Sequence, residues 1–465
     1  MPVLPSGACR AGALALVLPA LLASAAPVWA DEAPPPPPAL PTAADQPGQP
    51  APRKPAQPFA EQGITLAWSY TGEAAGNVSG GLARKSAYTG QVYLGADADL
   101  DRIAGIGGAT IHFAVTNRHG KSLSNIALGN NTSVQEVWGT QNTHLAILTW
   151  EQKLLHDRLV IEAGRSQANI HFLNSPFYCL FQTNSTCGNP TFVFKNSNFT
   201  YFPASSWMAQ AKLWVAPRWF AHAGVYEVNP DRKRWNDDGF NFSSANRTGV
   251  IVPWELGYAD DGHAGLGAET RLPGHYILGG WFDRADYSDP LRDDQGGIAI
   301  LTGRPARTLH GRSGIYVRFD QQLTRPDPRT RRGLSIFGVA MANLSGRVEE
   351  SRYLDFGIVQ TGTFKGRDTD TLGFVINDQR FSDLAMQRMR AARLAAGGED
   401  NVHRHQVMME LAYGADVVPG LRVSPNVQYV LHPDNTGAPF NRANTGNALV
   451  FGFKFTLDGP TFFGR

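Results

Sequence analysis

After residue 30 the chain lacks any long apolar run. No later segment approaches the roughly 18 uninterrupted apolar residues of a membrane-spanning helix, which argues against a helical membrane protein. A net charge of one sign is also missing, because 42 Lys and Arg stand against 40 Asp and Glu. This balance gives no reason to expect a nucleic acid or a strongly acidic partner.

Motifs that would carry catalysis are missing as well. The sequence contains no GxSxG, HExxH, paired CxxC or phosphate-loop motif, and Gly265-Leu266-Gly267 lacks the third glycine of a dinucleotide fingerprint. The many carboxylates could supply the acid pair of a glycosidase, yet no short polar segment concentrates two of them among aromatic residues. We therefore expect no cofactor and no metal site, with an outer-membrane enzyme as the alternative to the function inferred below.

Cysteine is scarce, with three in the chain. Cys9 precedes a segment from Arg10 to Ala30 that places an apolar core after a basic residue and ends in VWA. Small residues at the −3 and −1 positions of a cleavage site complete the pattern of a secretory signal peptide. We expect residues 1–30 to be removed by cleavage after Ala30.

The two remaining cysteines, Cys179 and Cys187, lie in CLFQTNSTCG. An exported chain meets oxidising conditions, so two cysteines that span a short polar loop predict a disulfide that stiffens this loop. A zinc site would need more ligands nearby, and His171 is the one local candidate.

Residues 31–60 are rich in proline, with five in a row from Pro34 to Pro38. Such a composition cannot bury a core, and it predicts an extended or disordered linker in the periplasm. Whether this linker is a spacer, a cell-wall contact or an inert tail stays open.

Short alternating runs follow one another from Gly63 to the end of the chain. The last three are HQVMMELAYGADVV, LRVSPNVQYV and NALVFGFKFTL, and each has one apolar and one polar parity. Pro419-Gly420 predicts a tight turn, and residues 432–445 predict a long polar loop. With the earlier runs and weaker ones near Leu256–Leu272 and Tyr353–Phe364, about sixteen strands fit, and many reach the length that crosses a bilayer.

We therefore predict an all-β fold for residues 61–465: a transmembrane antiparallel β-barrel of about sixteen strands, with short periplasmic turns and long outer loops. The first strand would pair with the last, at residues 448–457, and Pro419-Gly420 would mark the periplasmic end. A soluble β-sandwich or barrel shows the same alternation and remains the alternative on these runs alone. Residues 381–397 depart from alternation and predict a short helix in a long loop, with Ser382 or Asp383 as its cap.

The polar parity of these runs would face the lumen of such a barrel. Opposed charges across a lumen create a transverse field, and a solute rich in hydroxyls exchanges water for paired donors and acceptors at little cost. Any wide barrel has a charged interior, so the prediction applies to the set and not to one member. The predicted pore-lining residues are Lys212, Arg318, Asp320, Glu410, Arg422 and Gln428, with Gln210, Tyr316 and Asn426 beside them, and Glu410 with Arg422 as a pair on adjacent strands.

Several segments resemble the carbohydrate-selective porin family (OprB type) of Gram-negative bacteria. The residues that carry the resemblance are AGRSQANIHFLNSPFYCLFQTNSTCGNP (163–190), YFPASSWMAQAKLWVAPRWFAHAGVYEVNP (201–230), LPGHYILGGWFDRADYS (272–288), VSPNVQYVLHPDN and ALVFGFKFTL. GITLAWSYTGEAAGNVSGGL resembles the N-terminal segment of that family. The resemblance runs in preserved order from about Gly63 to Leu457, and GVYEVNP with CLFQ…CG is its most specific part.

The resemblance implies a monomeric outer-membrane barrel of about sixteen strands that passes glucose and similar sugars by diffusion through a narrowing lined by Arg and Glu. Its partners would be monosaccharides, outer-membrane lipid and lipopolysaccharide, and the barrel assembly machinery. The AGR motif makes Arg165 the first candidate for the narrowing, with Glu162 on the same strand. Alternation sets the two on opposite faces of a regular strand, and a bulge at Gly164 would reconcile them.

Two features depart from the family's pattern. The Pro-rich linker is not part of it, and the chain runs past its last strand as DGPTFFGR. Because an outer-membrane strand often ends the chain on an aromatic residue, recognition by the assembly machinery would use Phe455 or an internal signal.

Overall fold

The computed structural model describes residues 59–260, 272–327 and 330–463. The expected signal peptide and nearly all of the expected linker lie outside the described residues. Of the helices in the described ranges, none is long and apolar enough to cross a membrane.

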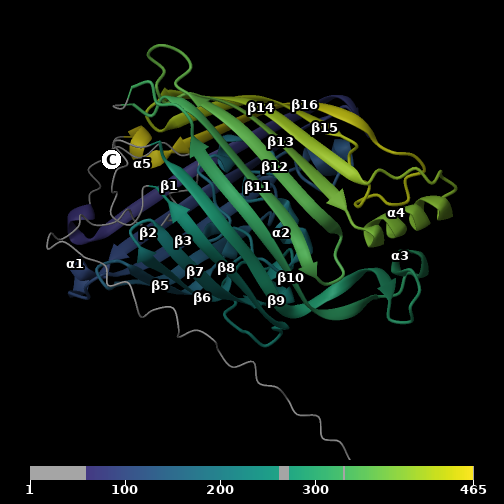
Figure 1. Cartoon of the computed structure of the whole chain (residues 1–465), viewed down its shortest axis with the longest axis horizontal. Helices are drawn as coiled ribbons and strands as arrows, with labels where there is room; N and C mark the ends of the chain where they lie inside the picture. The colour runs from purple at the N-terminus through teal and green to yellow at the C-terminus, as the bar shows by residue number, and fades with distance from the viewer. Residues whose placement is uncertain (1–58, 261–271, 328–329, 464–465) are drawn as a thin grey trace, which may run out of the picture. The chain divides into compact units, whose positions relative to one another are not determined.

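Sixteen antiparallel strands close into one barrel, and each is hydrogen-bonded to its neighbours in the sequence (Figure 1). The last strand closes the ring on the first, with Thr71 opposite Thr456 and Ala74 opposite Phe453. The predicted all-β antiparallel barrel and the predicted pairing of its first and last strands are confirmed. The strands are β1 (Ile64–Gly81), β2 (Ser86–Asp99), β3 (Ala109–Gly120), β4 (Thr143–Leu154), β5 (Leu159–Ser166), β6 (Ser206–Ala216), β7 (Trp219–Val228), β8 (Gly249–Ala259), β9 (Gly274–Asp293), β10 (Ala306–Gln322), β11 (Gly333–Ser345), β12 (Glu350–Thr361), β13 (Thr371–Phe381), β14 (His405–Val418), β15 (Leu421–Leu431) and β16 (Gly446–Asp458).

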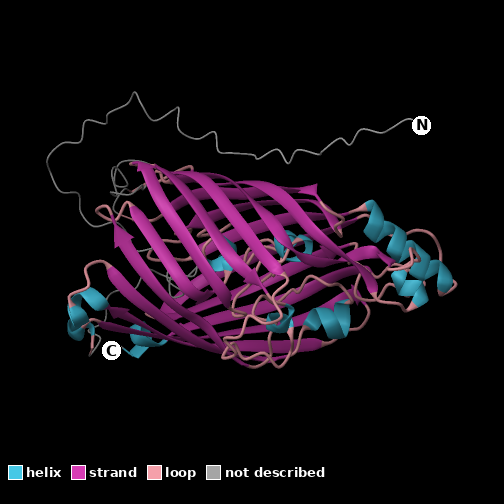
Figure 2. Ribbon diagram, turned by 90° about the horizontal axis from the view of Figure 1, so that it is seen from below, coloured by secondary structure: helices cyan, strands magenta, loops and turns pink. Residues whose placement is uncertain are grey.

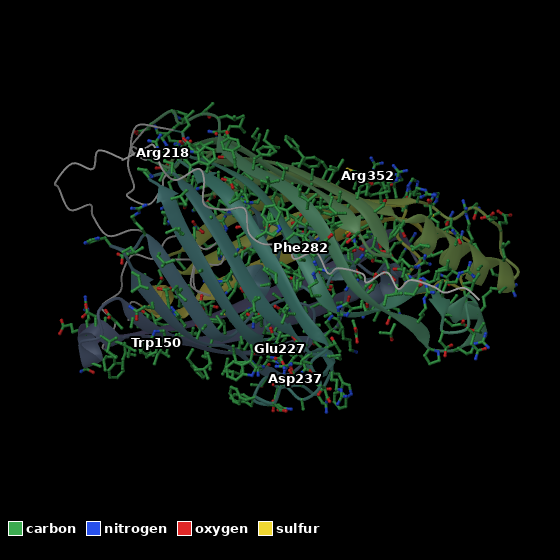
Figure 3. The ribbon with its side chains drawn as sticks, turned by 60° about the horizontal axis from the view of Figure 1, so that its bottom comes forward. Trp150, Arg218, Glu227, Asp237, Phe282 and Arg352 are labelled. Atoms are coloured by element: carbon green, nitrogen blue, oxygen red, sulfur yellow. A yellow bond between two sulfur atoms is a disulfide. The ribbon has the colours of Figure 1, made fainter. Side chains whose placement is uncertain are left out.

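Alternation along each strand divides the wall into an outer and an inner face. On β12 the outward Leu354 and Phe356 are exposed, whereas the intervening Tyr353 and Asp355 are buried. Trp150 and Phe282 are exposed on the outer face in the same way (Figure 3). Because apolar side chains on the outside of a closed barrel face lipid, the pattern that predicts the strands also predicts the membrane-facing wall.

The connections at the two ends of the barrel differ in length. At one end, which we call the turn end, Val418 pairs with Leu421 across Pro419-Gly420, and Gly420 has a φ of +80° that favours glycine. At the other end, the loop end, long connections span residues 121–142, 167–205, 382–404 and 432–445. The predicted tight turn and the predicted long loop therefore lie at opposite ends of β15.

Short helices occupy several connections. The predicted helix is α4 (Asp383–Ala395), and the Ser382 hydroxyl caps it by accepting a hydrogen bond from the Ala385 N–H at 3.2 Å. After β16 the chain forms α5 (Gly459–Phe463), where the Phe463 ring stacks on Trp68 with centroids 5.5 Å apart. The others are η2 (Ala60–Gln62), α1 (Leu100–Ala104), η3 (Ser124–Leu128), η4 (Ala168–Ile170), η5 (Tyr178–Leu180), α2 (Thr191–Asn196), η6 (Pro230–Lys233) and α3 (Ala299–Thr302).

One weak strand lies earlier than the sequence predicts. The strand expected near Leu256–Leu272 is β8, which ends at Ala259, and β9 begins at Gly274. Residues 261–271 of the expected range lie outside the described residues. Pro253 sits inside β8, and because proline cannot donate a ladder hydrogen bond, it weakens the strand signal in the sequence.

Candidate functional site

Short helices and loops lie within the ring of strands (Figure 2), and two long connections at the loop end are hydrogen-bonded to the inner wall of the barrel. The first inner loop, residues 121–142, joins β3 to β4, and the second inner loop, residues 167–205, joins β5 to β6. A barrel of this many strands is wide enough to hold an aqueous channel. The two inner loops therefore determine how much of that width a solute can use.

Buried carboxylates on the inner wall hold both loops. A carboxyl oxygen accepts hydrogen bonds from backbone and side-chain donors, so several buried acids together can fix loops that have little regular structure. Much of the charged inner wall is thus engaged by protein. The contacts are Glu73 with Val137 N (3.1 Å), Glu255 with Leu173 N (2.8 Å), Asp283 with Asn198 N (2.9 Å), Glu350 with Lys195 Nζ (2.9 Å), Asp355 with Thr186 Oγ1 (2.7 Å) and Glu410 with Gln182 N (2.8 Å).

Glu410 and Gln428, both predicted as pore-lining, belong to this anchoring set. The Glu410 carboxylate accepts from the backbone N–H groups of Gln182 at 2.8 Å and Thr183 at 2.7 Å. Gln428 lies opposite Glu410 in register and donates Nε2 to the Val134 carbonyl at 3.0 Å. Both side chains face the interior, as predicted, but there they bind loop backbone.

A disulfide joins Cys179 to Cys187 within the second inner loop. Lys454 on the inner face of β16 donates to the Cys179 carbonyl at 3.4 Å and to the Phe181 carbonyl at 3.2 Å. The same ammonium group lies 3.5 Å from Glu73 Oε1. The cross-link therefore stiffens a part of the loop that the inner wall also holds.

Glu162, expected at the narrowing with Arg165, faces the barrel interior. It pairs in register with Glu151 and Gln210, whose exposed fractions are 5% and 3%, and Gln210 Nε2 donates to it at 3.0 Å. His171 of the second inner loop lies 3.5 Å away. Burial lowers the pKa of His171 even though Glu162 opposes the shift, so at neutral pH this imidazole is uncharged.

Arg165 lies on the opposite face of β5. It pairs with Leu148 and Trp207, which are 37% and 41% exposed on the outer wall. Along β5, which is described in full, the register runs without a shift, so Gly164 makes no bulge despite its φ of +143°. This corrects the expectation that Arg165 and Glu162 share the narrowing: alternation continues through Gly164 and separates them.

The Arg165 guanidinium instead anchors the connection between β7 and β8. It is buried and donates to the carbonyls of Asn241 at 2.9 Å and Ser205 at 2.8 Å. The rings of Phe242 and Trp207 lie 5.5 and 5.9 Å from it. A cation over aromatic rings and bonded to two carbonyls indicates a structural role.

Replacement of Arg165 by Ala is expected to destabilise the barrel, because two buried carbonyls lose a charged donor at about 1–3 kcal/mol each. The folded barrel and the heat-unfolded chain migrate differently on a gel, and the change should lower the temperature at which the folded band is lost. It should also make residues 229–248 more accessible to protease. Glucose block of conductance, measured in a planar bilayer, should persist in the molecules that fold. If the variant loses glucose block while its stability is unchanged, Arg165 contributes to the pore and the structural role is contradicted.

The remaining predicted residues face the interior but do not converge on one place. Arg422 is not paired with Glu410, since the register sets it opposite Asp416, close to the turn end. Glu410 and Arg422 lie on adjacent strands and face one interior, as predicted, but they are not opposite each other in register. The observed partners are Asp320 for Arg318, Asp416 for Arg422 at 2.9 Å, and for Lys212 the rings of Phe220 at 4.3 Å and Trp214 at 5.0 Å.

A cavity of about 280 Å³ lies at the loop end between the inner loops and the wall. Arg118 on β3 points into it, 3.5 Å from Glu136 of the first inner loop, and donates Nε to Gln91 at 2.7 Å. The Arg118 guanidinium also lies 5.7 Å from the ring centroid of Phe202. The rest of the lining that bears aromatic or charged groups consists of Trp138, Phe194, Phe199, Tyr201, Glu227, Arg232 and Lys233.

This lining combines paired donors and acceptors with aromatic faces. A carboxylate and a guanidinium can each replace water around hydroxyl groups, and ring faces offer apolar surface beside them. Burial and the neighbouring Arg312 lower the pKa of Lys233, while Asp283 opposes the shift. The arrangement suits a small polyhydroxylated solute better than a bulky or strongly charged one.

Sequence reasoning missed most of this cavity. Arg118 could have been found, because it shares the inward parity of His112 and Thr116 on β3. Glu136, Trp138 and Tyr201 lie on the inner loops, which carry no strand period that would predict where a side chain points.

Comparison with known proteins decides the family. The family model described as carbohydrate-selective porin, OprB family, matches residues 83–458. This chain belongs to that family. Porin B of Pseudomonas aeruginosa is 31% identical to this porin over 409 residues, which cover 85% of this chain and 87% of the relative. Putative porin QuiX of Acinetobacter baylyi is 27% identical over 401 residues, which cover 81% and 86%.

A solved structure supports the same assignment. The high-pH structure of Pseudomonas putida OprB has a TM-score of 0.76 to this porin at 29% identity, and the match covers 86% of this chain and 95% of that one. The relatives are porins, which are transport channels and not enzymes. A porin barrel of this family belongs to the outer membrane of Gram-negative bacteria.

Proposed function

We propose that this porin conducts glucose and similar sugars by passive diffusion, and that the cavity beside Arg118 and Glu136 is where it selects them. The observation that carries the proposal is the placement of an Arg–Glu ion pair next to Phe202, Trp138 and Tyr201 in a barrel that two inner loops narrow. A sugar can exchange water for the charged pair and lay its ring against the aromatic faces. No covalent step and no energy coupling are involved.

The orientation and maturation of the chain are part of the proposal. Short turns lie on the periplasmic side of bacterial barrels, so the turn end would face the periplasm and the loop end the outside. Residues 1–30 would be removed as a signal peptide, residues 31–60 would form a periplasmic linker, and residues 61–465 would form a barrel that acts as a monomer. Assembly would need the barrel assembly machinery.

Replacement of Arg118 by Ala is expected to weaken the block of single-channel current by glucose. One partner of the ion pair is lost, and a charged hydrogen bond is worth about 1.5–3 kcal/mol, so the concentration of glucose for half-block should rise about tenfold or more. The measurement uses purified protein in a planar bilayer with glucose titrated on one side. Arg390→Ala is the control, because Arg390 of α4 also pairs with a carboxylate, Asp400 at 3.0 Å, and neither residue lines the cavity.

The same preparation separates the channel from the enzyme. Steady conductance that glucose reduces supports the proposal, and a closed bilayer with folded protein would contradict it. Release of reducing ends from an oligosaccharide would favour the outer-membrane enzyme instead. Liposome swelling with a panel of sugars then shows which solute passes fastest.

A further inference from the structure

Two arginines lie directly opposite each other on the outer wall at the loop end. Arg352 on β12 pairs in register with Arg380 on β13. Both face outward. Arg352 lies on the same strand face as exposed Leu354 and Phe356, and Arg380 lies on the same face as exposed Phe374. Figure 3 labels Arg352 on this wall. Like charges directly opposite on antiparallel strands destabilise a sheet, so this pair needs an explanation.

Within the described residues, no carboxylate forms an ion pair with either guanidinium. Two nearby carboxylates are engaged elsewhere. Asp378, two residues before Arg380 on the same face of β13, binds His405 at 2.8 Å, and Asp383 binds Arg404 at 2.6 Å. Other arginines at the loop end are paired inside the chain: Arg307 and Arg347 with Asp289, and Arg388 with Glu349. The opposed pair is thus left for a negative group from outside the protein.

The height of the pair on the barrel indicates what that group is. Along β12 from Arg352 toward the turn end, the side chains on the outer face are Leu354, Phe356 and Ile358, followed by the polar Gln360. Arg352 and Gln360 are eight residues apart, so at about 3.3 Å per residue and a tilt near 40° they span roughly 20 Å across the membrane. That is close to the height of an apolar band, which places the arginines at its edge, among lipid headgroups.

Outward side chains in register on neighbouring strands form rows across the wall. Arg352 lies opposite Ala342 of β11 on one side, and Arg380 lies opposite His405 of β14 on the other. The third row down holds Phe356, Ile376 and Met409 in register. The row directly below the arginines holds Leu354, Asp378 and Val407, and His405 engages the Asp378 carboxylate at 2.8 Å. The apolar surface below the arginines therefore runs from Leu354 and Val407 to the third row, and a lipid could contact both the charges and this surface.

We propose that Arg352 and Arg380 clamp a phosphate of a lipid headgroup while the apolar surface below contacts its acyl chains. Guanidinium groups match phosphate oxygens in two-point geometry, and side chains directly opposite on a sheet are close enough to share one phosphate. Free phosphate would use the charges but not the apolar surface, so the occupant is a phosphorylated lipid. With the proposed orientation it belongs to the outer leaflet.

The test is native mass spectrometry of the detergent-solubilised mature protein with diphosphoryl lipid A as probe. Arg352→Gln with Arg380→Gln should weaken binding about tenfold or more, since two charged bonds to phosphate are lost. Arg352→Lys with Arg380→Lys should restore part of it, and Arg390→Gln should bind like the parent chain. Gel mobility before and after heating confirms that each variant is folded.

Three results would overturn the proposal: equal binding by the double Gln variant, equal binding of phosphatase-treated lipid A, or displacement of the lipid by inorganic phosphate at similar concentration. Glucose block of conductance is measured in parallel and should not change in the double Gln variant. Because lipid binding is read in detergent without a current, failure of the lipid site and failure of the sugar channel give different results.

Discussion

Replacement of Glu410 by Ala is expected to raise single-channel conductance severalfold and to remove most of the block by glucose. The carboxylate accepts two backbone N–H groups of the second inner loop, at 2.8 Å from Gln182 and 2.7 Å from Thr183. Both are buried, and leaving them without an acceptor costs about 1–3 kcal/mol each. The loop segment around the disulfide should then leave the wall and widen the path.

A second carboxylate variant controls for the loss of charge. Asp416 lies on the same strand as Glu410 but pairs with Arg422 near the turn end. Asp416→Asn removes one negative charge from the interior without touching an inner loop, so it should change ion selectivity slightly and leave conductance near that of the parent. Parent-like conductance in Glu410→Ala, with the barrel folded, would show that the loop stays in place without this anchor.

Replacement of Cys179 and Cys187 by Ser is expected to loosen the second inner loop. The two cysteines are eight residues apart, and opening so short a loop corresponds to roughly 2.5 kcal/mol in the chain-entropy account. The variant should show noisier current, weaker glucose block and faster proteolysis between residues 175 and 189. The outer wall does not depend on this bond, so gel mobility of the unheated protein should be retained.

Reductant supplies the comparison for the double Ser variant. Dithiothreitol should shift the parent protein toward the behaviour of the variant and leave the variant unchanged. If the parent in reductant and the variant both keep quiet current and full block, the loop is held by its wall contacts and the disulfide is dispensable for selection. Lys454, which donates to two carbonyls of this segment, would then be the next residue to change.

The barrel could be predicted because its signal is local. A strand's side chains alternate at every residue, so HQVMMELAYGADVV by itself shows that Glu410 faces away from Leu411. The same argument correctly turned Lys212, Arg318 and Arg422 inward. It failed for β8, where Pro253 interrupts the pattern. At β5 alternation itself holds, and the bulge invoked to keep Arg165 in the pore is what was wrong.

The candidate site could be predicted only in part. Parity reveals that a residue faces the interior, but it does not reveal what meets the residue there. Glu410 and Gln428 face the interior as predicted. They were expected to line the pore, whereas both side chains are hydrogen-bonded to the backbone of the inner loops. Arg165 stood out by motif, and its partner Asn241 lies in a connection whose path no periodicity predicts.

The sequence by itself determined the strands, the face each side chain takes and the family, because all three depend on neighbours along the chain. The tertiary structure decided the width of the path. Glu410 and Gln182 are 228 residues apart, and Asn426 meets Gln182 across 244. Contacts of such separation join segments that only the closed barrel brings together, so a pore lining built from inner loops is a property of the fold and cannot be read from any single segment.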